Sequence, residues 1–327
     1  MALLLAPSLL ALSATCTDGP LRVSVDDVPA LHAALASSGA VIVTGIGVAD
    51  GKWEAAAATL PNLTFPNQLL SKTPKVQGVH LEHAGLKQNQ TGNGFGLVGK
   101  PLLPHTDGYI YGDHLPDYIA FLVESQSEEG GENYLVDGES VLRRLCEDEG
   151  GQAPALCPLL STLEVDLTER SPPGFVNGRE AKGPLMQRRQ GGRLRFRRQC
   201  SVLACEDAVD EANRLRVDLR PYQSLWGVAG EDTLGQAQRM LQAVDVAVQQ
   251  EAAAAPRFLV ERGEALLLDN YRMLHGREGY RGDKERKLWR VWFWSTASDG
   301  LPAGAPEVGS VLDAGSVLER AADPTTK

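Results

Sequence analysis

His105-Thr106-Asp107 places a histidine and a carboxylate two residues apart. Side chains at positions i and i+2 of a β-strand point to the same side, so these two can share a metal ion without bending the backbone. The residues before the motif, Gly99 to Pro104, are interrupted by proline, and the residues after it, Gly108 to Gly112, are aromatic and bounded by glycine. This pattern is typical of a strand that ends in a loop, where active-site ligands usually lie.

A second histidine, His275, follows a short apolar segment much later in the chain. Residues Glu264 to Asn270 come after the turn Arg262-Gly263 and predict a buried strand, and Tyr271 to Arg277 is the segment that leaves it. Two imidazoles and one carboxylate form the set that holds iron(II) on one face and leaves the opposite face open. The sequence therefore predicts a non-haem iron site of an oxygenase, with the ligands His105, Asp107 and His275.

Several arginines follow His275 and lead into an apolar, aromatic run, Trp289 to Trp294. On a strand Arg290, Trp292 and Trp294 would share one face. A buried guanidinium needs an anion, because a buried unpaired charge is costly and arginine matches a carboxylate through two hydrogen bonds. The anion that we expect is the distal carboxylate of a 2-oxoacid. The alternative is a set of surface ion pairs that joins Arg286 and Arg290 to Asp283 and Glu285.

Three blocks in this order resemble the successive signatures of the taurine dioxygenase family: His105 to Gly108, Gly130 to Gly138, and Asp269 to Arg277. The resemblance is closest to gamma-butyrobetaine and trimethyllysine hydroxylases, extends to clavaminate synthase, and covers roughly residues 90 to 295. It implies a mainly β fold with helical insertions, a double-stranded β-helix or jelly roll. It also implies the cofactor Fe(II), 2-oxoglutarate as co-substrate, and O2.

The resemblance also assigns roles to single residues. It implies that the iron ligands are His105, Asp107 and His275. Arg286 matches the arginine that binds the distal carboxylate of 2-oxoglutarate, although Arg281 is a rival, and Arg290 matches a second arginine near co-substrate or substrate. Asn133 stands where many relatives have a threonine that hydrogen-bonds this carboxylate, and an amide can donate the same bond. The small zinc domain of gamma-butyrobetaine hydroxylases is not recognisable, so carnitine-pathway substrates are not implied.

The expected reaction is the hydroxylation of an unactivated C–H bond in a small molecule, such as an amino acid or a betaine-like compound. Halogenating relatives replace the carboxylate ligand with a small residue that admits chloride, whereas this chain keeps Asp107. Desaturation and cyclisation use the same ligands and stay open. Two other classes are a non-catalytic β-helix protein that binds metal or ligand and a metal-dependent hydrolase, and neither needs an arginine clamp beside an open iron position.

Length and composition agree with one catalytic domain. The 327 residues could hold two average domains, but jelly-roll enzymes with insertions reach this size as one unit. We expect residues 1–20 to be a leader or a disordered N-terminus, 21–298 the jelly-roll domain, and 299–327 a C-terminal tail. The net charge of −10 argues against a nucleic-acid partner, because such proteins need positive patches that offset phosphate. The sequence leaves the number of subunits open.

The expected location is intracellular, in the cytoplasm, as a soluble enzyme without a membrane partner. Met1 to Ala14 is apolar, but it lacks the positive charge of a secretory signal and is too short to span a membrane. A cleaved N-terminal targeting leader is the alternative. The cysteines show no metal or disulfide pattern, and their odd number favours a reducing compartment. They are Cys16, Cys146, Cys157, Cys200 and Cys205.

Hydrophobic periodicity predicts further elements. Residues Arg193 to Arg198 alternate arginine with apolar residues, which indicates either a solvated edge strand or a strand that binds an anionic group of the substrate. Three further histidines, His80, His83 and His114, are expected to be structural or loop residues. Residues 147–158 are expected to be a linker. Strands are predicted at 21–25, 40–44, 118–124 and 162–168, and helices at 28–37, 53–59, 139–147 and 234–254.

Overall fold

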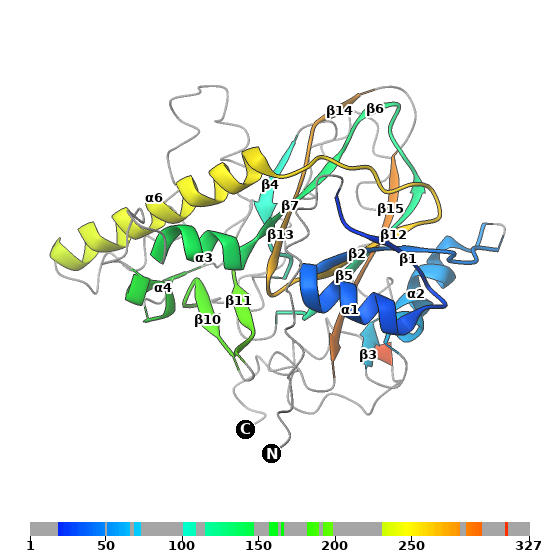
Figure 1. Ribbon diagram of the computed structural model, residues 1–327, viewed down its shortest axis with the longest axis horizontal. Helices are drawn as coiled ribbons and strands as arrows, with labels where there is room; N and C mark the ends of the chain where they lie inside the picture. Colours follow the sequence, from blue (N-terminus) through cyan, green and yellow to red (C-terminus); the bar gives the residue numbers. More distant parts are fainter. Residues whose placement is uncertain are drawn as a thin grey trace, which may run out of the picture.

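The structure is a computed structural model, and it describes residues 19–49, 51–65, 69–72, 101–108, 115–146, 157–162, 165–166, 182–189, 192–198, 231–281, 286–295 and 311–312. These residues form mixed β-sheets with few helices, arranged as Figure 1 shows. Among the described residues, we find no helix with the length and apolar character that crossing a membrane requires.

The larger sheet has seven strands in the order β1-β2-β12-β5-β15-β3-β16. Neighbouring strands are antiparallel, except that β1 is parallel to β2 and β16 is parallel to β3. The strands are β1 (Arg22–Ser24), β2 (Ala40–Thr44), β3 (Leu69–Lys72), β5 (Tyr118–Ser125), β12 (Ala265–Asp269), β15 (Lys287–Ser295) and β16 (Val311–Leu312).

A smaller antiparallel sheet has three strands with β13 (Met273–Arg277) in the middle. Its outer strands are β4 (Leu102–His105) and β7 (Asn133–Asp137). Three further strand pairs complete the β structure. They are β6 (Glu129–Gly130) with β14 (Tyr280–Arg281), β10 (Met186–Arg188) with β11 (Leu194–Phe196), and β8 (Val165–Asp166) with β9 (Lys182–Gly183).

Helices cover the outer side of each sheet (Figure 1). On the larger sheet, α1 (Val28–Ser38) and α2 (Trp53–Thr64) pack against one set of alternating strand residues, which includes Val41, Leu122 and Leu267. On the smaller sheet, α3 (Gly138–Cys146), α4 (Cys157–Thr162) and α6 (Glu231–Ala254) pack against Val136 and Leu274. Each large apolar side chain buried in this way stabilises the fold by about 1.5–3 kcal/mol.

The strand residues that point away from these helices form an inner cluster between the two sheets. Ile42, Ile119, Leu266 and Trp292 come from the larger sheet, and Leu135 packs against them from β7 of the smaller one. Because side chains on a strand alternate between its faces, the larger sheet buries apolar residues on both sides. The inner face therefore gives the functional residues of both sheets a common, water-poor space.

Helix α1 shows how the local sequence produces an element. The Asp27 carboxylate accepts a hydrogen bond from the Ala30 N–H at 3.1 Å, and proline stands in the first turn, both of which favour a helix start. The helix ends at Gly39, which has a φ of 75° and donates its N–H to Leu35 O at 2.8 Å. The predicted helix at 28–37 is thus confirmed.

Most of the other predicted elements are also confirmed, although their ends differ by a few residues. In α6, the predicted buried residues Leu241, Val244 and Val248 lie in the core, whereas the side chains of Leu234 and Ala237 are outside the described residues. Two predictions are wrong. Thr162, expected to begin a strand at 162–168, is instead the last residue of α4, and within that range the described residues Val165–Asp166 form β8. Helix α4 also begins inside the expected linker at 147–158.

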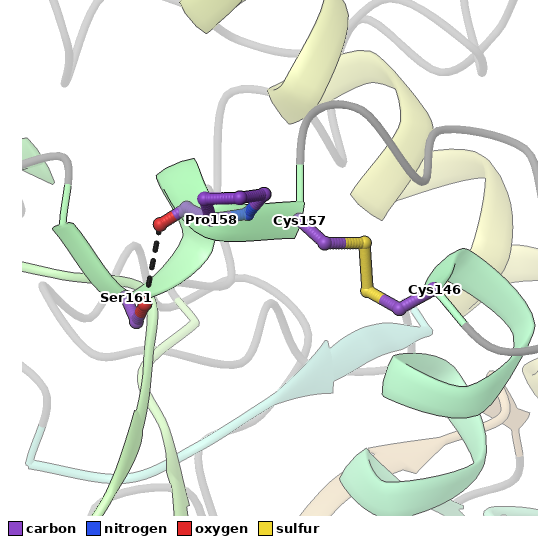
Figure 2. Close-up of a disulfide and its surroundings, with 4 residues drawn as sticks. All are labelled: Cys146, Cys157, Pro158 and Ser161. Atoms are coloured by element: carbon purple, nitrogen blue, oxygen red, sulfur yellow. Dashed lines mark hydrogen bonds between the residues drawn. A yellow bond between two sulfur atoms is a disulfide. The ribbon is translucent and has the colours of Figure 1, made fainter.

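A disulfide joins Cys146, the last residue of α3, to Cys157, the first residue of α4 (Figure 2). Both helices pack on α6, where Leu145 and Leu160 belong to the same core cluster, and this packing brings the two cysteines together. The expectation that the cysteines show no disulfide pattern is therefore wrong. Structural disulfides are rare in the reducing cytosol, so the cysteine residues no longer support a reducing compartment.

Replacing both Cys146 and Cys157 with serine should lower the free energy of unfolding by roughly 2–3 kcal/mol, because a short closed loop restricts the unfolded chain. Thermal unfolding with and without a reductant measures the effect. The reductant should lower the melting temperature of the unchanged protein and leave that of the double variant where it is. Equal sensitivity of both proteins to the reductant would contradict a stabilising Cys146–Cys157 bond.

Candidate metal centre and anion site

Two strands of the smaller sheet bring the two predicted histidines together. His105 is the last residue of β4, and His275 lies in the middle of β13. The two strands pair so that His275 stands opposite His105, and Asp107 follows in the turn after β4. The pairing of β4 with β13 therefore brings together two histidines that are far apart in the sequence.

Three donor atoms converge between these residues. The Oδ1 atom of Asp107 lies 3.4 Å from His105 Nε2 and 3.5 Å from His275 Nε2, and the imidazole centroids are 4.3 Å apart. One ligand atom from each of the three residues lies within 4.8 Å of the others. Asp107 is 5% exposed and His105 8%, so bulk water competes little for the site. Two imidazoles and a carboxylate at this spacing fit the donor set that iron(II) takes.

The protonation of His105 also suits a metal ligand. Its Nδ1 atom lies 2.8 Å from the carbonyl oxygen of Leu103, which can only accept a hydrogen bond. Nδ1 therefore carries the proton, and Nε2 keeps a lone pair that points toward Asp107. The ring of Phe121, on β5 of the larger sheet, lies 5.2 Å from the His275 ring and packs against it.

The electrostatic surroundings keep the carboxylate charged and the imidazole neutral. Burial by itself would raise the pKa of Asp107, but the charge of Arg290 and the neighbouring side chains of His105 and His275 hold it well below its usual range. For His275, burial is the main cause and the neighbouring His105 the next, and together they lower its pKa to about 4 despite Asp107. A neutral imidazole and an ionised carboxylate are the forms that bind metal.

Asn270 holds the turn that carries Asp107. Its side-chain oxygen accepts the Asp107 N–H at 3.0 Å, and its amide donates to the carbonyl oxygens of Asp107 and Pro116, each at 2.9 Å. Asn270 is fully buried. This role of Asn270 was not predicted from the sequence, although Asn270 stands in the third block of the family resemblance. Its position between a buried strand and His275 was the available signal.

The second oxygen of Asp107 contacts the larger sheet. Oδ2 accepts hydrogen bonds from Arg290 Nη1 at 2.8 Å and from Trp292 Nε1 at 2.9 Å, both on β15. The prediction that Arg290 and Trp292 share a strand face agrees with this arrangement. From the sequence, Arg290 was expected near co-substrate or substrate, and its hydrogen bond to the Asp107 carboxylate was not anticipated.

A second cationic cluster lies where β15 begins. Arg286 is 8% exposed and Arg277 6%, and both guanidinium groups lie near the Tyr280 ring, at 5.8 and 4.5 Å from its centroid. Among the described residues, Arg286 has a hydrogen bond to the Gln126 side-chain oxygen at 3.3 Å and no carboxylate partner. Burial, and then Arg277, lower the pKa of Arg286 to about 9. An anion bound between these arginines would stabilise their positive charges and so offset both the burial and the repulsion between them.

The structure places the other predicted residues as follows. Asn133 begins β7 opposite Arg277, on the same face of the smaller sheet as His275, and it is half-buried. Arg281, the rival of Arg286, is exposed on β14. The alternative prediction, a surface ion pair for Arg286, is wrong, because this side chain is buried. The residues Asp283, Glu285, His80, His83 and His114 lie outside the described residues.

The basic strand β11 also differs from the favoured prediction. A solvated edge strand would expose its arginines, but Arg195 and Arg197 are 1% and 0% exposed. Arg197 donates two hydrogen bonds to Pro184 O, at 3.1 and 2.9 Å, and Arg195 donates to the side chain of Gln187. The strand is thus part of the interior, with its guanidinium groups bonded to the neighbouring strand region.

Gly276 allows Tyr134 to lie across β13 next to His275. A Cβ atom at position 276 would lie 2.3 Å from Tyr134 Cζ, and the Tyr134 hydroxyl donates to Leu102 O on β4 at 3.0 Å. The Tyr134 ring therefore reaches from β7 across the middle strand β13, and its hydroxyl is hydrogen-bonded to β4.

Replacing Gly276 with alanine should cost about 1–3 kcal/mol of stability, because the buried ring of Tyr134 must move. The midpoint of denaturant unfolding should fall while its slope stays the same. Gly47→Ala is the matched control, since nothing lies within 4 Å of a Cβ atom there. Equal midpoints for the two variants would show that the contact with Tyr134 does not restrict position 276.

Comparisons with known proteins add two findings. The family model described as "Taurine catabolism dioxygenase TauD, TfdA family" matches residues 17–292. Among proteins of curated function, none matches the sequence.

Several solved structures resemble the chain at low sequence identity. An asparagine oxygenase, AsnO, is 14% identical with a TM-score of 0.53, over 88% of this chain and 84% of that one. The non-heme iron oxygenase OrfP, solved with Fe and alpha-ketoglutaric acid, is 13% identical with a TM-score of 0.50, over 87% and 85%. A taurine dioxygenase from Burkholderia xenovorans is 13% identical with a TM-score of 0.48, over 85% and 87%.

Proposed function

This chain belongs to the taurine catabolism dioxygenase TauD, TfdA family, and on this basis we propose that it hydroxylates an unactivated C–H bond of a small amino-acid-like or betaine-like molecule. Members of the family are oxygenases that use iron(II), 2-oxoglutarate and O2, so the chain is an oxidoreductase. We assign the two facing sheets to the double-stranded β-helix of the family. In this proposal the iron ligands are His105, Asp107 and His275.

The observation that carries the proposal is the convergence of three donor atoms. Asp107 Oδ1 lies 3.4 and 3.5 Å from the two imidazole Nε2 atoms, in a buried space between two sheets. Ligands on one face of an octahedral ion leave three positions on the other face. When bound, iron(II) with 2-oxoglutarate and O2 supplies the oxidation: the oxoacid becomes succinate and carbon dioxide, and one oxygen atom enters the substrate C–H bond.

The protein's own residues bind and orient the reactants. Arg286 is the proposed anchor for the distal carboxylate of 2-oxoglutarate, because it is buried beside Arg277 and has no carboxylate partner among the described residues. The exposure of Arg281 favours Arg286 over this rival. Asn133 and Arg290 lie on the inner faces of the smaller and larger sheets, and we assign them to the surroundings of the co-substrate.

Succinate formation tests the proposal directly. The purified protein with iron(II), O2 and 2-oxoglutarate is given a panel of amino acids and betaines, and succinate is measured with and without each compound. Hydroxylation predicts a product that has gained one oxygen atom, whereas desaturation or cyclisation predicts the loss of two hydrogen atoms. Matched reactions without O2 or with a chelator should form no succinate. A protein that binds iron but forms no succinate with any compound would favour a non-catalytic binding role.

A further inference from the structure

The two oxygen atoms of the Asp107 carboxylate have different neighbours. Oδ1 faces the imidazoles of His105 and His275, at 3.4 and 3.5 Å. Oδ2 faces the larger sheet and accepts hydrogen bonds from Arg290 Nη1 at 2.8 Å and Trp292 Nε1 at 2.9 Å. One oxygen is therefore directed at the candidate metal position, and the other is bound by β15.

An ionised carboxylate oxygen offers about two lone pairs to hydrogen-bond donors or to a metal. Arg290 and Trp292 use both at Oδ2. We propose that Trp292 is a positioning residue, which restricts Asp107 to metal binding through Oδ1 alone. This inference rests on the proposed function, because it takes Asp107 as a metal ligand.

Trp292 and Arg290 contribute differently to this restraint. The Arg290 guanidinium supplies the charge that keeps Asp107 ionised, but its long side chain can follow a carboxylate that rotates. Trp292 is a rigid ring, 8% exposed, packed in the inner cluster with Ile119 and Leu266. The Arg290 guanidinium also lies 5.0 Å from the Trp292 ring centroid, an attractive cation–π contact that holds both groups together. The indole N–H therefore has a fixed direction, and it sets the plane of the carboxylate.

The consequence concerns how many coordination positions stay open. Three protein ligands that each give one atom leave three of six positions, enough for two atoms of 2-oxoglutarate and one O2. If Asp107 bound through both oxygens, one of these positions would be lost. Outer hydrogen bonds of this kind typically contribute 10- to 100-fold to metal affinity or activity. In this way Trp292 would keep open the coordination position that O2 needs.

The test compares Trp292→Phe with Trp289→Phe. Trp289 lies on the opposite face of the same strand, is 9% exposed, and also donates its indole N–H to a carboxylate, Glu124 Oε2, at 2.8 Å. Both changes remove an indole–carboxylate bond, but only Trp292 contacts Asp107. Infrared difference spectra are recorded when iron(II) is added under nitrogen, without co-substrate. The separation of the two carboxylate stretching bands is wide for binding through one oxygen and narrow for binding through two.

We expect a wide separation in the unchanged protein and in Trp289→Phe, and a narrow one in Trp292→Phe. The succinate rate per bound iron should also fall about 10- to 100-fold in Trp292→Phe. A wide separation in Trp292→Phe, or a narrow one in the unchanged protein, would overturn the inference. A narrow separation in the unchanged protein overturns the inference even if the variant fails to fold. Absence of any iron-dependent carboxylate band there would instead refute Asp107 as a ligand, and with it the proposed site.

Discussion

Asp107→Ala should abolish succinate formation and iron binding together. The change removes one of three ligands, so activity should fall by more than the roughly 100-fold that is typical of losing an outer-shell partner. It also removes the acceptor for Arg290 Nη1 and Trp292 Nε1. Equilibrium dialysis with iron(II) and the succinate assay measure the two losses.

Asp137→Ala is the control for this prediction. Asp137 also carries a carboxylate bonded to an arginine, since Arg272 Nη2 donates to its Oδ2 at 2.6 Å, but it belongs to the end of β7 and to no part of the proposed site. This variant should bind iron and form succinate as before. If Asp107→Ala and Asp137→Ala both bound iron(II) as tightly as the unchanged protein, Asp107 would not be a ligand.

Arg286→Met should raise the apparent Michaelis constant for 2-oxoglutarate by about 30- to 4,000-fold. Losing one partner of a buried, hydrogen-bonded charge pair costs roughly 2–5 kcal/mol, and 1.4 kcal/mol corresponds to tenfold. The apo protein should lose little stability, because burial and the neighbouring Arg277 already disfavour a charge at this position. Initial rates against 2-oxoglutarate concentration and apo melting temperatures distinguish the two effects.

The exposed Arg281 provides the matched control, and Arg281→Ala should leave the Michaelis constant unchanged. The co-substrate, at 100 times its dissociation constant, should stabilise the unchanged protein by about 2.7 kcal/mol and Arg286→Met much less. An increase in the Michaelis constant for Arg281→Ala, with none for Arg286→Met, would transfer the anchor role to Arg281.

Local patterns in the sequence were sufficient for many single elements. Asp27, the proline after it and Gly39 mark the two ends of α1, and the apolar runs of β2, β5 and β12 indicate buried strands. The short blocks around His105 and His275 also identified the residues whose donor atoms the structure brings together. These signals are local because capping, side-chain alternation and ligand type depend on a few neighbouring residues.

Contacts between elements that are distant in sequence could not be predicted from such local patterns. Three interactions show this: the hydrogen bond from Trp292 to Asp107, the hydrogen bonds of Asn270 to the turn that carries Asp107, and the Cys146–Cys157 disulfide. Each joins two segments, and the local sequence of one segment does not indicate which other segment it contacts. Periodicity tells which side of a strand is buried, but strand order, register and helix packing choose what lies against that side. The amino-acid sequence alone thus pointed to His105, Asp107 and His275 as candidate ligands and to the elements that carry them. The packing of two sheets face to face selected which oxygen of Asp107 meets the imidazoles and which meets β15, because that choice depends on contacts across the interior.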